Sequence, residues 1–208
     1  MGVDGNRLYV VSSGINLDDI KSIEVSKKIF DTCFMGDIIP RKGILDLILA
    51  WKRVTNHLKD AKLLIIGKGN KSYLRKLNSV IKKLELQKHI IFAGFVPENQ
   101  KYKLLKSSKI FIFPSYAEGD PIVVREALAC ELPVVAYKLA GLVERYNDCI
   151  LFSEIGDSND MAKKTLTLLK DENLRHYMGL RGVERVSRYD WKRIARKELD
   201  IITECLGL

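Results

Sequence analysis

The sequence predicts an α/β domain in which a parallel sheet carries helices on both faces, a Rossmann-like doubly wound fold. Short apolar runs such as "LLII" and "IFIF" are continuous rather than alternating, which is typical of strands buried on both faces. Segments of helical spacing separate these runs along the chain. With 208 residues, the chain is long enough for one sizeable core, so a single domain is expected.

Each element follows from its local pattern. "AKLLIIG" has the composition of a buried strand, and "SYLRKLNSVIKKLEL" repeats apolar residues at spacings of three and four. The strands are predicted within 28–38, 61–67, 89–95, 109–115, 132–137 and 149–152. The helices are predicted at 43–58, 72–86, 98–108 and 121–130, and from 157 to the end with a break near Gly179–Gly182.

Residues 1–27 fit this alternation poorly. The stretch "YVVSSGINLDDI" could form a strand and a turn. We therefore expect residues 1–27 to be an N-terminal segment or interdomain connection, and residues 28–208 to form the Rossmann-like domain with its C-terminal helices.

Several classes of protein are disfavoured by composition. No apolar run approaches a membrane span, and the first residues lack the layout of a signal peptide. The four cysteines and three histidines are scattered, so neither a zinc site nor a disulfide framework is expected. These features predict an intracellular, cytoplasmic protein with reduced thiols.

The net charge of +9 suggests an anionic partner. Residues 181–197 hold seven Lys or Arg against two acids. This segment is either a solvated helix face or a surface that meets phosphates or acidic lipid headgroups at the inner membrane face. Nucleic-acid binding would also explain the charge, but no aromatic-basic signature or recognised motif supports it.

Ligands of open α/β sheets bind beyond the carboxyl ends of the strands, which directs attention to five loops. These loops are 36–43, 67–71, 95–98, 114–121 and 137–142. In "GKGNKS" a lone GxG favours a tight turn over a ligand loop. In "GDIIPRKG" Lys42 lies at a helix start, where the helix dipole disfavours a cation. Either an anion binds between the lysine and the helix N-terminus, or the side chain points to water.

The stretch "SYAEGDPIVVREALAC" combines a helix start with two glutamates. Pro121 suits the first helical turn, with Asp120 or Gly119 as N-cap, so Glu118 lies at the helix mouth and Glu126 inside the helix. Backbone amides at the mouth suit a phosphate, and the two carboxylates suit hydroxyls on either side of it. A nucleotide sugar has this layout, although Glu126 could equally be a surface residue.

The run "FPSYAEGDPIVVREALACELPVVA" resembles the "PS…EG…EA…G.PVVA" block of GT-B glycosyltransferases, specifically the retaining family 4 type with its E-x7-E motif. Four further blocks follow the family order: "FMGDIIPRKGILDLILAW", "LLIIGKG", "IIFAGFVPENQKYKLLKSSKIFIFPS" and "LAGLVERYNDCILF". The resemblance runs from about residue 8 to the end. It covers the C-terminal, donor-binding half of such an enzyme, without the acceptor-binding N-terminal domain.

The resemblance implies roles for the residues of these blocks. Glu118 and Lys42 are the implied catalytic residues: Glu118 would bind hydroxyls of the donor sugar, and Lys42 would neutralise the diphosphate. Glu126 would bind the ribose hydroxyls. The remaining implied donor-binding residues are Gly36, Asp37, Arg41, Gly69, Phe95 and Val96 (beside the nucleobase), Gly119, Asp120, Pro121, Ile122 and Val123. Neither a metal nor another cofactor is expected.

Three positions depart from the family pattern. Asp37 stands where the family usually has Arg, Asp120 adds an acid near the phosphates, and Glu131 replaces a glycine. These changes should weaken diphosphate binding, although Arg41 could substitute for the lost cation and Asp37 could orient Lys42 or Arg41.

We therefore expect a nucleotide-sugar-binding domain of a retaining glycosyltransferase. Such an enzyme transfers a hexose from a nucleoside diphosphate sugar to a glycan or lipid-linked acceptor, which the absent N-terminal domain would hold. The isolated domain is expected to be inactive. The alternative is a degenerate, non-catalytic nucleotide-sugar-binding or regulatory module of the same fold.

Overall fold

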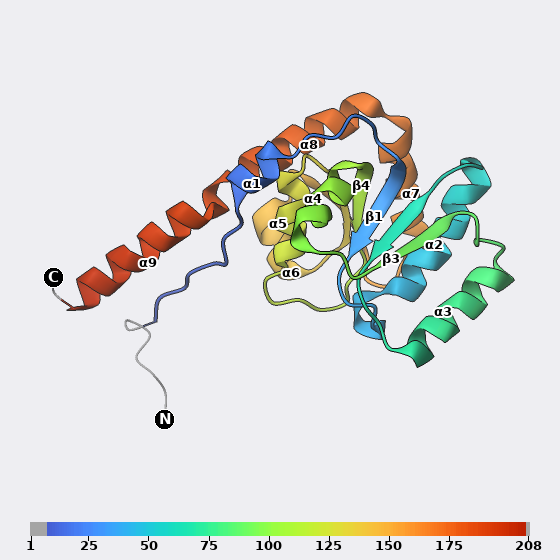
Figure 1. Ribbon diagram of the computed structural model, residues 1–208, viewed down its shortest axis with the longest axis horizontal. Helices are drawn as coiled ribbons and strands as arrows, with labels where there is room; N and C mark the ends of the chain where they lie inside the picture. Colours follow the sequence, from blue (N-terminus) through green and yellow to red (C-terminus); the bar gives the residue numbers. More distant parts are fainter. Residues whose placement is uncertain (1–7, 207–208) are drawn as a thin grey trace.

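The computed structural model describes residues 8–206, which form one six-stranded parallel sheet flanked by helices (Figure 1). The strands lie in the order β3-β2-β1-β4-β5-β6, and every neighbouring pair is parallel. Their bounds are Phe30–Met35 (β1), Leu63–Ile66 (β2), Ile90–Gly94 (β3), Ser108–Phe113 (β4), Val134–Tyr137 (β5) and Ile150–Ser153 (β6). The predicted Rossmann-like fold is confirmed.

Helices connect successive strands, and in the described part of the chain three further α-helices follow the last strand. Their bounds are Leu17–Ser22 (α1), Ile44–His57 (α2), Lys71–Lys83 (α3), Glu98–Lys106 (α4), Ile122–Ala129 (α5), Ala140–Tyr146 (α6), Ser158–Lys170 (α7), Glu172–Val186 (α8) and Trp191–Leu206 (α9). Short 3-10 helices, η2 and η3, occupy Pro40–Lys42 and Ser187–Tyr189. The helix α9 projects away from the body of the domain (Figure 1).

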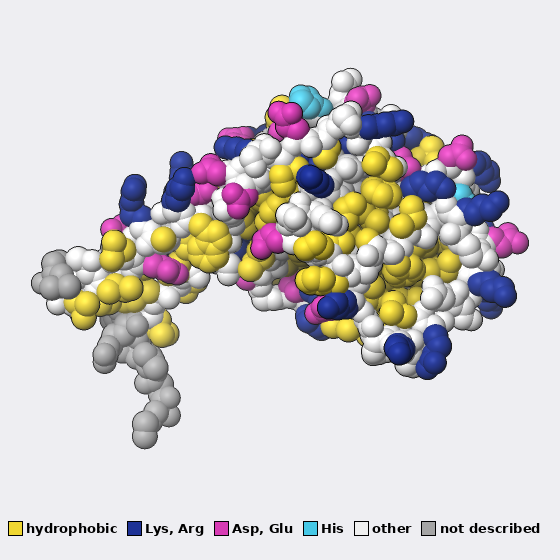
Figure 2. Space-filling view, in the orientation of Figure 1, with side chains coloured by type: hydrophobic (Ala, Val, Ile, Leu, Met, Phe, Trp, Pro, Cys, Tyr) yellow, Lys and Arg dark blue, Asp and Glu magenta, His cyan; other side chains and the backbone are white. Residues whose placement is uncertain are grey.

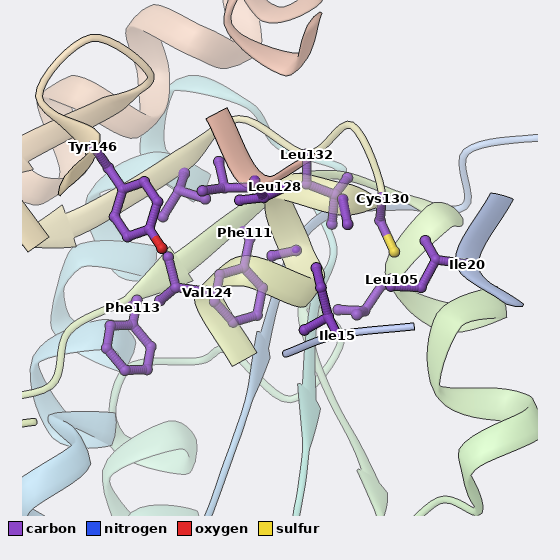
Figure 3. Close-up of a cluster of buried hydrophobic side chains, with 14 of the residues drawn as sticks. Ile15, Ile20, Leu105, Phe111, Phe113, Val124, Leu128, Cys130, Leu132 and Tyr146 are labelled. Atoms are coloured by element: carbon purple, nitrogen blue, oxygen red, sulfur yellow. The ribbon is translucent and has the colours of Figure 1, made fainter. Parts of the chain in front are cut away.

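Two buried clusters cover the two faces of the sheet, because successive side chains of a strand point to opposite sides. Cys33 belongs to the cluster under α4, α5 and α6, whereas its neighbour Phe34 belongs to the cluster under α2, α3 and α7. Phe111 and Phe113 alternate in the same way with Ile110. Figure 3 shows the first cluster, in which the phenylalanines of β4 face side chains of α5.

The segment before β1 is part of this core. Ile15, Leu17 and Ile20 are buried in the first cluster, and Figure 3 shows Ile15 and Ile20 beside Leu105 of α4. Asn16 caps α1, since its side-chain oxygen accepts from the amide of Asp19 at 3.3 Å. The interpretation of this stretch as a strand and a turn is therefore wrong. The division at residue 27 stays a prediction.

The expected helix break near Gly179–Gly182 is also wrong, because α8 runs through both glycines to Val186. The chain instead breaks at Asp171, which caps α8 with a side-chain bond to the amide of Leu174, and again at η3. The glycines allow α8 to approach α5 closely. A Cβ on Gly179 would lie 2.6 Å from the carbonyl oxygen of Glu131, and one on Gly182 would lie 2.8 Å from Leu128.

The basic segment 181–197 is distributed over the end of α8, η3 and the start of α9. Several of its cations bind carboxylates: Arg181 and Arg185 both contact Asp148, and Lys192 lies 2.7 Å from Asp18. These pairs agree with a solvated, ion-paired face. Figure 2 shows hydrophobic side chains over α9. This helix carries the exposed Leu199 and Ile202. Within residues 8–206, no helix is long and apolar enough to cross a membrane.

We predict that Gly179→Ala destabilises the domain by about 1–3 kcal/mol, because the new methyl group would collide with backbone that cannot rotate away. Chemical denaturation measures the free energy of unfolding. Gly141→Ala is the control, since a Cβ there meets no atom within 4 Å in the helix α6. Equal stability of the two variants would contradict close α8–α5 packing as the reason for the glycine.

Candidate functional site

A pocket of about 610 Å³ opens at the carboxyl ends of the central strands, within the size range of small-molecule sites. Its walls come from the ends of β1 and β2, the loop before α4, and the loop that leads from β4 into α5. The lining residues are Met35, Gly36, Asp37, Lys42, Ile66, Gly67, Lys68, Phe95, Val96, Lys101, Glu118, Asp120, Pro121, Ile122 and Val123.

Backbone contacts hold the loops after β1 and β4 together. The amide of Tyr116 donates to the carbonyl of Arg41 at 3.0 Å, and the Arg41 guanidinium donates to the carbonyl of Ala117 at 2.5 Å. Gly43 has φ 68°, and a Cβ there would lie 2.0 Å from the carbonyl oxygen of Pro114. Glycine at position 43 therefore permits the close approach of the two loops.

Lys42 and Glu118 form an ion pair inside the pocket. The Lys42 ammonium lies 2.6 Å from Oε1 of Glu118, and the two side chains are only 13% and 11% exposed. The Ser115 hydroxyl donates to the same carboxylate oxygen. The alternative that Lys42 simply points to water is therefore wrong. Burial makes this pairing necessary, because an isolated charge here would lose its hydration.

The N-terminus of α5 lines the same pocket as this ion pair. Its N-cap is Pro121, with no side-chain hydrogen bond, so the expected capping by Asp120 or Gly119 is wrong. The first intrahelical bond within this turn is from the amide of Val124 to the Pro121 carbonyl. Because the amides of a first turn lack intrahelical acceptors, those of Ile122 and Val123 can donate to a ligand, and the helix dipole favours an anion there.

Asp120 binds to two arginines rather than standing free beside this helix. Its Oδ1 accepts from Arg125 and lies 3.1 Å from the Arg145 guanidinium. Arg125 is 1% exposed and also donates to the carbonyl of Ser13 at 2.6 Å and stacks on the ring of Tyr189. The negative charge of Asp120 is thus balanced by a network that joins α5 to α6 and to the segment before α1.

Glu126 is buried in α5 and bound to two side chains of α4. The Lys101 ammonium lies 2.6 Å from its Oε1, and the Tyr102 hydroxyl donates to the same oxygen at 3.1 Å. Burial, reinforced by the charge of Glu126, raises the pKa of Tyr102 to about 12, so this hydroxyl remains a donor at neutral pH. The interpretation of Glu126 as a surface residue is wrong.

Two charged residues of the pocket, Asp37 and Lys68, form no ion pair among the described residues. Asp37 is exposed, and among residues 8–206 no cation lies within ion-pair distance of it, so it does not orient Lys42 or Arg41. Lys68 lies over the ring of Phe95, with its ammonium 4.3 Å from the ring centroid. Phe95 is 68% exposed and offers a flat apolar surface at the pocket mouth.

Ten of the predicted site residues line the pocket, and four do not. Gly69 lies in the turn beside Ile38, as the tight-turn interpretation of "GKGNKS" requires. Arg41 is half exposed and 3.9 Å from Glu118, and a Cβ on Gly119 would meet nothing within 4 Å. Glu126 lies behind Lys101. Lys68 and Lys101 were missed, and only the abundance of lysine near these loops signalled them.

Within the described part of the chain, no three His, Cys, Asp or Glu side chains are grouped as a metal site. The three cysteines of the core, Cys33, Cys130 and Cys149, are buried, and none of the cysteines described here forms a disulfide.

The chain has a doubly wound α/β fold with a pocket at the carboxyl ends of its strands, and comparison with known proteins identifies the family. The model of the family "Glycosyl transferases group 1" matches residues 17–185, so the chain belongs to this family. An uncharacterised glycosyltransferase of Methanocaldococcus jannaschii is 30% identical over 90% of the chain and 51% of its own length. A phosphatidyl-myo-inositol mannosyltransferase of Mycobacterium leprae is 30% identical over 92% and 52%. The chain thus spans about half the length of these two relatives.

Solved structures agree on the fold. A glycosyltransferase from Rickettsia africae superimposes with a TM-score of 0.85 at 20% identity, over 98% of the chain and 59% of its own. The structure of Anabaena HepE with UDP and glucose gives a TM-score of 0.83 at 19% identity, over the same shares. The chain therefore has the fold of the C-terminal domain of a GT-B glycosyltransferase.

We predict that Asp120→Asn destabilises the domain by about 1–3 kcal/mol, because it removes the carboxylate that compensates the buried Arg125. Thermal or chemical denaturation without ligand measures the loss. Asp37→Asn, which also removes one acid from the pocket, should change stability by less than about 0.5 kcal/mol. A stable Asp120→Asn variant would show that the network does not need this carboxylate.

Proposed function

We propose that this chain is the nucleotide-sugar-binding domain of a retaining glycosyltransferase of the family 4 type. The observation that carries the proposal is the ion pair of Lys42 and Glu118 at the N-terminus of α5, inside the pocket. A cation, free helix amides and a hydroxyl-binding carboxylate stand together there. This combination suits the junction of a diphosphate and a sugar.

The two sides of the pocket suit the two ends of such a donor. Phe95 and Val96 border the side proposed for the nucleobase, and Glu126 is proposed to bind the ribose. The amides of Ile122 and Val123 and the Lys42 ammonium meet the diphosphate. Glu118 accepts hydrogen bonds from the sugar hydroxyls. The related Anabaena protein was crystallised with UDP and glucose, which makes UDP a natural first ligand to test.

The proposed chemistry is departure of the nucleoside diphosphate from the anomeric carbon of a hexose, with the new bond to the acceptor made on the same face. Negative charge then grows on the leaving phosphate oxygens. Lys42 and the α5 N-terminus are fixed close to that charge and favour it over the ground state. We propose that the chain's own groups stabilise this charge without a metal cofactor.

The acceptor is proposed to be a glycan or a lipid-linked sugar held by a further domain. A relative of similar sequence is named as a phosphatidyl-myo-inositol mannosyltransferase, which acts on a lipid. We place the enzyme in the cytoplasm, with the basic residues of α9 near an anionic membrane face. The isolated domain should bind the donor and transfer little, since the acceptor side of the cleft is supplied elsewhere.

The alternative of a non-catalytic module rested on the acids at positions 37 and 120. Asp120 is compensated by Arg125 and Arg145, so it does not by itself repel a diphosphate. Of the described acidic residues that line the pocket, Asp37 alone has no cation within ion-pair distance, and it is exposed to solvent, where its field is screened. The relatives are named as transferases, and catalysis is the better-supported interpretation.

Calorimetric titration with UDP- and GDP-sugars tests the donor site. We expect saturable binding of at least one of them, and Glu126→Ala should weaken it about 10- to 100-fold through loss of a charged hydrogen-bond acceptor. Glu144→Ala, a change of an exposed glutamate on α6, is the matched control and should leave binding unchanged. Failure of every nucleotide to bind, or equal affinity of the Glu126 variant, would refute the proposal.

Asp37→Arg should tighten donor binding by about threefold or more, because an acid at the pocket mouth becomes a cation near the diphosphate. Asp60→Arg makes the same change of net charge at an exposed turn outside the pocket and should have little effect. The same titration measures both. Weaker binding by Asp37→Arg would instead show that the native carboxylate contacts the ligand.

A further inference from the structure

Lys101 lines the pocket near Glu126, but the family motif includes only Glu126 as a donor-binding residue. It projects from α4 into the pocket, whereas Glu126 lies behind it in α5. A ligand group at this point of the pocket therefore meets an ammonium first. The lysine is 25 residues from Glu126 in sequence and belongs to a different helix, so its presence depends on the packing of α4 against α5.

The hydrogen bonds around this pair leave one donor and one acceptor free. The ammonium lies 2.6 Å from Oε1 of Glu126 and 3.2 Å from Oε1 of Glu98, which uses two of its three N–H groups. The Tyr102 hydroxyl donates to Oε1 of Glu126 as well. Among residues 8–206, no side chain donates to Oε2 of Glu126. Among the described residues, the pair thus keeps one N–H and one carboxylate oxygen without a side-chain partner.

The charges of the pair disfavour a phosphate at this point. Burial alone would lower the pKa of Lys101, but the hydrogen bond to Glu126 and the charge of that carboxylate outweigh burial and raise it. The ammonium is therefore charged at neutral pH and is balanced by Glu126, with the 80% exposed Glu98 adding a second negative charge. A phosphate would meet no surplus of positive charge here.

A neutral vicinal diol suits the same pair. One hydroxyl can accept from the Lys101 N–H while another donates to Oε2 of Glu126, and neither charge has to be removed. The ribose of a nucleoside diphosphate carries such a diol at its 2′ and 3′ positions.

We propose that Lys101 is a further donor-binding residue, which together with Glu126 binds the ribose 2′,3′-diol and selects ribonucleotides. This proposal rests on the proposed function. A site built to hydrogen-bond hydroxyls rejects an analogue that lacks them, because its polar groups are then left without partners. Removal of Lys101 should therefore cost affinity for the ribonucleotide and reduce the preference for it.

The test compares UDP with 2′,3′-dideoxy-UDP, and GDP with its dideoxy analogue, in calorimetric titrations of the chain. We expect the wild type to bind the ribonucleotide at least about tenfold more tightly. Lys101→Met should bind UDP about 10-fold more weakly and change its affinity for the dideoxy analogue by less than about threefold. Lys103→Met makes the same substitution at an exposed position of α4 and should behave as the wild type.

Equal losses for the two ligands in Lys101→Met would overturn the proposal, since they would indicate a structural effect or a contact elsewhere on the nucleotide. If the Met variant does not fold, the wild type provides the second measurement. Its lysines are labelled biosynthetically with ¹³C at Cε, which leaves all three N–H groups of each ammonium in place, and the Lys101 signal is assigned with Lys101→Arg. This signal should shift with UDP and not with the dideoxy analogue. A wild type that binds no nucleotide would instead refute the proposed function.

Discussion

The pairing of β1 with β4 determines where this domain can hold a ligand. β1 lies between β2 and β4, so the chain first builds the sheet outward to β3 and then returns to the other side of β1. The connections that follow β1 and β4 consequently cover opposite faces of the sheet, and a crevice opens between them. Lys42 belongs to the first connection and Glu118 to the second, and their ion pair spans this crevice.

Around the crevice, burial determines which carboxylates need a neighbouring cation. Each buried or half-buried carboxylate at the pocket has a cation from another element: Glu118 has Lys42, Asp120 has Arg125 and Arg145, and Glu126 has Lys101. A carboxylate taken out of water without such a partner would cost several kcal/mol. An acid near a proposed phosphate site is therefore weak evidence against phosphate binding unless its partners are known.

The sequence predicted the elements whose signal is local and missed those that depend on packing. The strands were recognisable because burial on both faces produces continuous apolar runs. The short helices α1 and α6 were not expected, since they contain few residues and much of their stability comes from the core beneath them. Gly179 and Gly182 were taken for a break, because glycine weakens a helix and also allows two helices to approach, and sequence alone does not separate these uses.

The candidate site was predictable to a similar degree. The motif residues Lys42 and Glu118 and the start of α5 lie in two loops that follow strands. Their position at the carboxyl ends of the strands could therefore be expected. The partners of Asp120 and Glu126 could not, because Arg145 and Lys101 are 25 residues away from them and reach the pocket only when α6 and α4 pack beside α5. Residue patterns locate the groups, and tertiary packing decides which charge each of them meets.

Under the proposed function, the ion pair of Lys42 and Glu118 makes recognition of the two parts of the donor interdependent. In the free domain each charge neutralises the other, so neither is fully available to a ligand. Sugar hydroxyls that donate to Glu118 take over part of the role of Lys42, and the ammonium can then turn toward a phosphate oxygen. The diphosphate in turn stabilises the displaced ammonium. The sugar and the phosphates therefore each lower the cost of binding the other, which favours the intact nucleotide sugar over its separate halves.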